Sequence, residues 1–163
     1  MFFKIYQKLL GTSCLALCLV GCGSDSSEPL VEVEKNSFNS TIKIISKTDN
    51  IEIQDLKLNR GNCTVNFVPV GEALQMGVLS QVTPISIQDF KDMASVYKTF
   101  EDDQRERLAN IANKISQLEQ KGVMMEPQVL KFGEKREGIS QGCDIIEAEI
   151  QTDKGSWTFN FDR

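Results

Sequence analysis

Two kinds of hydrophobic pattern divide the chain after its first 30 residues. From Val31 to Val70, β-branched and other apolar residues alternate with polar ones, and this period of two is typical of β-strands. A shift of the period at Gln54-Asp55 predicts a β-bulge, and Pro69 marks an edge strand or the end of a strand. The predicted strands are 31–34, 41–47, 51–58 and 63–70, with turn residues at 48–50 and 59–62.

The period changes to three and four residues between about 86 and 121, which predicts a helical segment. Ser86 and Asp89 are placed as a capping box, and Gly122 stands where a helix commonly ends. A single helix would be about 50 Å long at 1.5 Å per residue, which exceeds the width of a domain of this size. Thr99 with Asp102 could cap a second start, so we favour two helices over one. Residues 71–85 fit either a short helix or a loop.

The end of the chain returns to β-structure. Segments 123–125 and 128–132 flank Pro127, Gly133-Glu134 forms a turn, and 143–152 alternates as a strand. Hairpin residues at 152–155 lead to a last strand with Trp157, Phe159 and Phe161 on one face. The sequence therefore predicts a single α+β domain over 31–163. It would be a small antiparallel sheet or β-sandwich interrupted by a central helical insertion at about 86–121.

The first 21 residues have the pattern of a secretory signal peptide. Lys4 and Lys8 precede an uncharged apolar run, 9–20, of about a dozen residues, whereas a membrane-spanning helix needs roughly 20. At its end, Leu19-Val20-Gly21-Cys22 resembles the lipobox of bacterial lipoproteins. The resemblance implies cleavage before Cys22 and attachment of lipid to its thiol, with 22–30 as a flexible tether. An ordinary signal peptide with an incidental Cys22 is the alternative.

The resemblance also carries an expectation about location. In Gram-negative lipoproteins an Asp after the lipidated Cys often retains the protein in the inner membrane, so Gly23 favours the outer membrane of the cell envelope. Stable anchoring takes more than one acyl chain, and buried methylenes contribute about 0.8 kcal/mol each. The first expected partner of the protein is therefore the membrane, through the lipid on Cys22.

Charge limits the other partners of the domain. The net charge of the whole chain is −5, and removal of Lys4 and Lys8 with the signal peptide makes it −7. An acidic domain has no electrostatic attraction for nucleic acid or for an anionic membrane surface. The lipid is then the expected membrane contact, and a protein of the envelope is the expected further partner.

The five cysteines have separate predicted roles. Cys14 and Cys18 belong to the signal peptide and Cys22 carries the lipid, which leaves Cys63 and Cys143. An exported domain folds in an oxidising compartment, so these two are predicted to form a disulfide, with two buried free thiols as the alternative. Closing a loop of about 80 residues contributes roughly 4 kcal/mol in the chain-entropy model.

The sequence contains no recognisable catalytic residue, and neither a metal nor a cofactor is predicted. The chain has no His, which excludes the common general base and zinc ligand. It also lacks the glycine-rich nucleotide-binding motifs. The acidic patch Glu101-Asp102-Asp103 could bind a cation or act as a carboxylate pair, but acidic residues also belong in the first turn of a helix, and we favour this second explanation. Arg60 lies on a predicted turn and is a candidate binding contact, although a turn before a disulfide explains it as well.

The apolar stripe of the helical segment has two interpretations. It could pack on the domain's own sheet, which we favour. Alternatively, its far end, formed by Leu108, Ile111, Ile115 and Leu118, could bind a partner.

These observations favour one class of function. The protein is expected to be a non-catalytic binding and assembly lipoprotein of the envelope, or an exclusion lipoprotein, and not an enzyme. The alternatives are a carboxylate-dependent hydrolase of cell-wall glycans and an inhibitor of a lysin.

Overall fold

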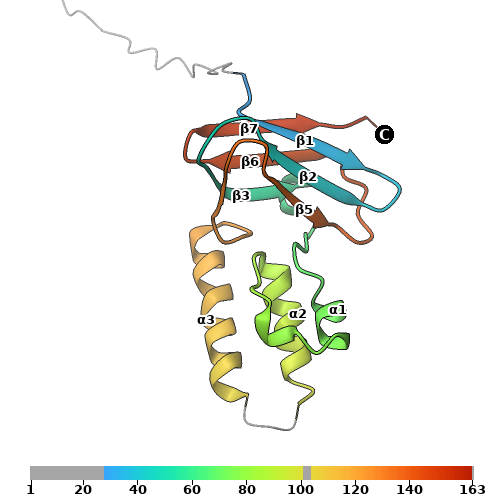
Figure 1. Ribbon diagram of the computed structural model, residues 1–163, viewed down its shortest axis with the longest axis vertical. Coiled ribbons are helices and arrows are strands. Elements are labelled where there is room, and N and C mark those ends of the chain that lie inside the picture. Colours follow the sequence, from blue (N-terminus) through green and yellow to red (C-terminus); the bar gives the residue numbers. More distant parts are fainter. Residues whose placement is uncertain (1–27, 101–103, 163) are drawn as a thin grey trace, which may run out of the picture.

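The computed structural model describes residues 28–100 and 104–162. Two antiparallel sheets pack against each other, and a group of helices extends from one side of them (Figure 1). The first sheet has the order β1-β2-β5, and the second has the order β4-β3-β6-β7. This arrangement confirms the predicted α+β class with a β-sandwich and a helical insertion. The strands are β1 (Val31–Asn36), β2 (Thr41–Ser46), β3 (Ile51–Leu58), β4 (Gln128–Leu130), β5 (Lys135–Ile139), β6 (Glu147–Thr152) and β7 (Gly155–Asn160).

The sandwich core follows from the alternation in the sequence. Ile42 and Ile44 of β2 and Ile51, Ile53 and Ile150 of the second sheet are at most 1 % exposed. They belong to one hydrophobic cluster, and each such side chain contributes about 1.5–3 kcal/mol on burial. The register of β3 against β6 shifts between Ile53 and Asp55, which confirms the predicted bulge. The hairpin β6–β7 is also as predicted, and Trp157 and Phe159 pack against the core.

The helical insertion has its own core. It contains α1 (Val70–Gln75), a 3-10 turn (Leu79–Gln81), α2 (Ile87–Tyr97) and α3 (Arg105–Lys121). Two helices in place of one long helix confirm the favoured prediction, whereas the proposed Thr99–Asp102 cap includes a residue outside the described part of the chain. The Ser86–Asp89 capping box is present, and Gly122 ends α3 with a φ of 70°.

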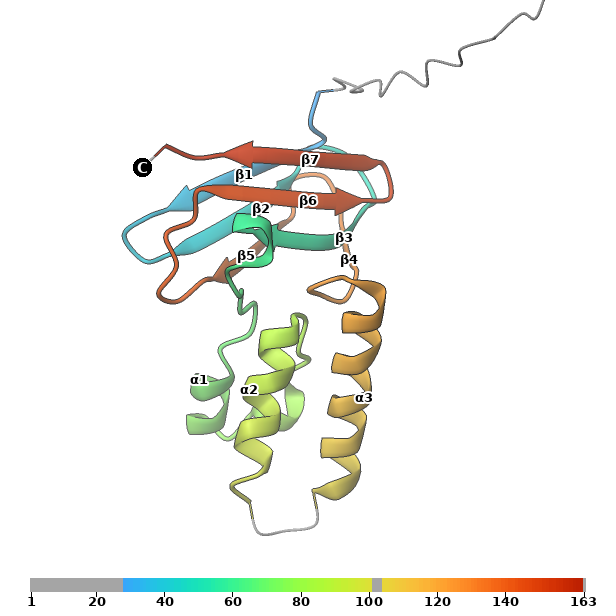
Figure 2. The ribbon, with the colours of Figure 1, turned by 180° about the vertical axis from the view of Figure 1, so that it is seen from behind.

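The expectation that the helical stripe packs on the sheet was wrong. Ile111 and Leu118 of α3 belong to a second cluster with Phe90 and Met93 of α2, separate from the sandwich core. The insertion begins at Val70, earlier than the expected residue 86, so α1, which the expectation did not include, adds Val70 and Ala73 to the apolar cluster of the helices. The side-by-side helices lie beneath the sandwich in both views (Figures 1 and 2).

Two strand predictions also need correction. Segment 63–70 forms no regular strand but only isolated antiparallel bridges, at Cys63 with Leu58 and at Asn66 with Ile139. The last predicted strand before the hairpin begins at Glu147 rather than at Cys143. Strand β5 was missed, because the sequence Lys-Arg-Glu-Gly-Ile has no apolar alternation.

No helix among the residues that the structure describes has the length and apolar character needed to cross a membrane.

Candidate functional site

The joint between sandwich and helical insertion is organised by Asp89, the third residue of α2. Its carboxylate is fully buried and accepts hydrogen bonds from the backbone N–H groups of Ile85 and Ser86, at 3.1 and 2.9 Å to Oδ2. It also accepts from Phe67 N–H and Val68 N–H, at 3.1 and 3.2 Å to Oδ1. One helix-capping side chain therefore ties together two separate passages of the chain through the joint.

A second buried carboxylate holds the segment in which the chain returns from α3 to the sandwich. Asp55, at the bulge of β3, accepts from Met124 N–H at 2.7 Å and from Leu56 N–H at 3.0 Å. Burial raises the pKa of Asp55 above its ordinary value, against the lowering effects of these N–H groups and of Lys57, 3.5 Å away. Backbone hydrogen bonds from Ile87 N–H to the Met124 carbonyl and from Glu126 N–H to the Ile85 carbonyl join this returning segment to the start of α2.

A groove of about 610 Å³, here called the joint groove, lies where these passages leave the sandwich. This volume lies in the range of ligand sites, which commonly form where structural units meet. Its walls come from the segment after Asn66, from α1, from α2, and from the end of β5 and the following loop. The lining residues are Asn66, Phe67, Val68, Pro69, Val70, Gly71, Glu72, Asp92, Ser95, Val96, Glu137, Ile139 and Gln141.

The joint groove combines apolar walls with negative charge. Phe67, Val68 and Val96 line it, together with Ile139, which is 41 % exposed. Its carboxylates come from Glu72, Asp92 and Glu137, and its lining includes no Lys or Arg. Asp92 accepts from Asn66 Nδ2 at 2.6 Å and from Gln88 Nε2 at 2.7 Å, so amide groups position this carboxylate.

Gly138 sets how closely the wall of the joint groove approaches β5. A Cβ at this position would lie 2.5 Å from Val65 Cγ2 and 3.1 Å from Phe67 Cε1. The side chains of Val65 and Phe67 therefore occupy the space that any larger residue would need. This close approach keeps the segment before the joint against β5.

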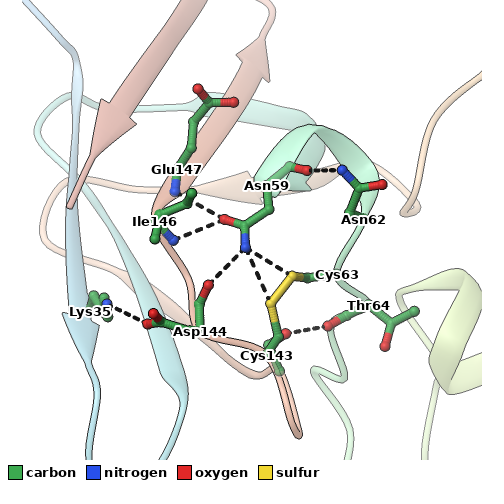
Figure 3. Close-up of a disulfide and its surroundings, with 10 residues drawn as sticks. Lys35, Asn59, Asn62, Cys63, Thr64, Cys143, Asp144, Ile146 and Glu147 are labelled. Carbon is green, nitrogen blue, oxygen red and sulfur yellow. Dashed lines mark hydrogen bonds and ion pairs between the residues drawn. A yellow bond between two sulfur atoms is a disulfide. The ribbon is translucent and has the colours of Figure 1, made fainter. Parts of the chain in front are cut away.

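The predicted disulfide between Cys63 and Cys143 is present, which confirms that expectation. Asn59 organises its surroundings (Figure 3). The Asn59 amide nitrogen donates to both sulfur atoms and to the carbonyl of Asp144, and its oxygen accepts from Ile146 N–H and Glu147 N–H. The disulfide thus joins the segment between β3 and the insertion to the loop before β6.

The other predicted site residues do not come together. Arg60 follows Asn59 on a left-handed turn, with its side chain 82 % exposed and its Nε 3.4 Å from Glu147 Oε1, and it does not line the joint groove. In α3, Ile111 and Leu118 are 8 and 2 % exposed, and Leu108 and Ile115 are half-buried against the same helical core. This side of α3 is therefore engaged mainly within the protein.

Several predictions fall outside the described part of the chain. They are the lipobox with Cys22 and the acidic patch 101–103. Within residues 28–100 and 104–162, no group of three or more acidic or Cys side chains is placed to hold a metal ion.

Sequence reasoning did not find the joint groove. The one signal in this region was Pro69, which predicts an edge strand or the end of a strand. Asn66, Asp92 and the β5 residues Glu137 and Ile139 come from three separate parts of the sequence, and only the fold of the chain brings them to one surface.

Comparisons of this chain with protein-family models, with curated proteins and with solved structures found no match.

Proposed function

We propose that this protein is a lipid-anchored protein of the bacterial cell envelope that acts as a non-catalytic binding module. It would hold an envelope protein for assembly, or block one as exclusion lipoproteins do. Lipid on Cys22 anchors it, with Gly23 favouring the outer membrane. The joint groove is the observation that carries the binding role, because it offers a concave and partly apolar surface where two structural units meet.

The position of the chain's entry supports an outward-facing groove. Leu30 leads into β1 and accepts from Lys47 N–H at 2.9 Å, so the entry is fixed to the sandwich. This entry lies on the side away from the helices in both views (Figures 1 and 2). From Cys22 to Glu28 the chain reaches at most about 20 Å, at 3.3–3.6 Å per residue. An anchored protein would therefore present its insertion away from the anchor point.

The disulfide supports an exported location. Cys63 and Cys143 are bonded across the entire insertion, and such bonds persist in oxidising compartments.

The lipid anchor is tested by metabolic labelling with a palmitate analogue in cells that produce the full chain. Label is expected on the natural protein and absent from Cys22→Ser, which should also leave the membrane fraction. A labelled Cys22→Ser variant would contradict the anchor.

The binding role is tested by photo-crosslinking in intact cells. A photoreactive amino acid at Val96, in the joint groove, is expected to capture one envelope protein. The matched control is Phe38, which is fully exposed on the hairpin between β1 and β2. Capture from neither position, or the same captured proteins from both, would argue against a binding role for the joint groove.

The hydrolase remains a second candidate because Glu72, Asp92 and Glu137 line one concave surface. A glycosidase needs two carboxyl groups across such a surface. Release of soluble fragments from purified cell wall, abolished by Asp92→Asn and by Glu137→Gln, would support this activity. The binding role predicts no release by the natural protein.

A further inference from the structure

Strand β5 has an open edge at the joint groove. Residues 134, 136 and 138 face β2 with their backbone groups, because Ser46 N–H donates to the carbonyl of Glu134 and the direction alternates along a strand. Ile139 faces the other way and exchanges two hydrogen bonds with Asn66, at 2.8 and 2.9 Å. Glu137 and Lys135 face the same way as Ile139, and no described residue bonds to their outward N–H and C=O groups.

The segment after Asn66 would cover this edge if its pairing continued. In that register Val68 would be the next residue to bond, opposite Glu137. Instead, Val68 N–H donates to Asp89 and the Val68 carbonyl accepts from Val70 N–H at 2.9 Å. Pro69 has no N–H to offer. The chain therefore leaves β5 at Val68, and the joint groove opens beside the unpaired backbone of Glu137.

The side chains around this edge restrict what can pair with it. The apolar wall includes Phe67 and Val96, while the charged groups of the lining are the carboxylates of Glu72, Asp92 and Glu137. Short edge strands that carry charges resist pairing with arbitrary strands. A complementary strand would carry a basic side chain close to an apolar one.

We propose that the joint groove binds an extended segment of a partner protein, which adds as a strand to the outward edge of β5. Backbone groups of Glu137 and Lys135 pair with the segment, its Lys or Arg lies among the three carboxylates, and its apolar side chains lie against Phe67 and Val96. In this mode the main-chain hydrogen bonds give affinity and the side-chain pockets give selectivity. The proposal rests on the proposed function and specifies the partner's chemistry.

The test is selection from a phage-displayed library of random linear peptides on the purified lipid-bearing chain in detergent. Three variants separate the contributions. Glu137→Pro removes the outward N–H and the carboxylate without removing a bond to β2, whereas Glu137→Gln removes the charge alone, so the difference between these two variants measures the contribution of the N–H. Glu32→Gln is a matched control on the opposite edge strand, β1.

Peptides that alternate Lys or Arg with apolar residues are expected to be enriched. Their affinity should fall at least about tenfold in Glu137→Pro, which is a loss of about 1.4 kcal/mol, and severalfold in Glu137→Gln. Glu32→Gln should bind as the natural protein does. The circular dichroism spectrum and thermal midpoint of each variant show whether it is folded. If a variant unfolds, the backbone pairing is tested instead with the natural protein and an N-methylated form of the selected peptide, which lacks the N–H groups.

Other outcomes would overturn strand addition. These are an absence of enrichment, enrichment of acidic peptides, or binding by Glu137→Pro that is as tight as binding by Glu137→Gln. Conversion of a dimer to a monomer by Glu137→Pro in sedimentation would identify a second copy of this chain as the occupant and would also overturn the proposal. Capture of a folded or helical region from Val96 in cells would preserve the binding role while rejecting strand addition, so the two failures are distinguishable.

Discussion

Val68 donates its backbone N–H to Oδ1 of Asp89 at 3.2 Å, although a regular ladder would direct it to Glu137 of β5. The same carboxylate caps α2 through Ser86. Asp89 therefore links the start of the helix to the place where the chain leaves the sandwich. The open edge beside Glu137 is a consequence of this link.

Asp89→Ala is expected to destabilise the protein by about 3–5 kcal/mol. The substitution leaves four backbone N–H groups without their acceptor, and buried unsatisfied donors cost about 1–3 kcal/mol each, although relaxation makes these costs less than additive. Urea unfolding measures the loss. Glu32→Gln, an exposed change outside the joint, is the control and should alter stability by less than about 0.5 kcal/mol. A similarly small effect of Asp89→Ala would mean that water or other groups replace the carboxylate.

Removal of the disulfide by Cys63→Ala with Cys143→Ala should cost about 4 kcal/mol, because 80 residues separate the two positions. Asn59 is the matched probe, since it contacts both sulfur atoms and also the backbone of Asp144, Ile146 and Glu147. Asn59→Ala should destabilise the oxidised and the double-Ala forms alike through the lost backbone contacts. Urea unfolding of all four forms measures both effects. If Asn59→Ala had no effect without the disulfide, the sulfur contacts would be its main role.

Asp55 predicts a pH dependence of stability. Burial raises its pKa in the folded protein above the unfolded value, which is about 3.9. The folded state therefore binds more protons, and the contribution of Asp55, fully present below the unfolded pKa, is lost as the pH rises through the folded pKa. Asp55→Asn removes this titration and retains an oxygen for Met124 N–H. Its stability relative to the natural protein should increase as the pH rises, which urea unfolding over a pH series measures. A difference independent of pH would contradict the raised pKa.

Gly138→Ala is expected to destabilise the protein by about 1–3 kcal/mol, the usual cost of overpacking. Its Cβ would contact Val65 Cγ2, whose residue is buried and β-branched and so cannot turn away freely. Gly71→Ala is the control, because its Cβ meets nothing within 4 Å and the position is helical. This change should stabilise by about 0.5–1 kcal/mol. Thermal unfolding distinguishes the two, and equal effects would show that the packing over β5 is loose.

Local patterns predicted much of this fold, because they depend on neighbouring residues. The Ser86–Asp89 capping box, the bulge before Asp55 and the β6–β7 hairpin all follow from short-range chemistry. The long-range role of Asp89 was not accessible in this way, since Phe67 and Val68, whose N–H groups donate to its carboxylate, lie more than 20 residues before it. The joint groove could not be predicted for the same reason, because its lining residues come from separate parts of the sequence.

Two strand errors have related physical causes. Segment 63–70 has strand-like alternation, but Asp89 draws Val68 out of the ladder. Strand β5 lacks alternation, because it is an edge strand whose buried face includes the glycine Gly138 beneath Val65. In both cases the tertiary contact overrides the local preference.

Leu118 distinguishes the two interpretations of the helical stripe. It is 2 % exposed and packs in the helical core, so Leu118→Ala should cost about 2–5 kcal/mol and should lower the unfolding midpoint without a partner present. Leu74 of α1, which is 38 % exposed, is the matched control, and Leu74→Ala should cost less than about 1 kcal/mol. Urea unfolding of the purified variants provides the comparison. If Leu118→Ala were as mild as Leu74→Ala and instead reduced capture of a partner in cells, this side of α3 would be a binding surface. The structure predicts the opposite, because the side chains of α2 already occupy the space that a partner's residues would need.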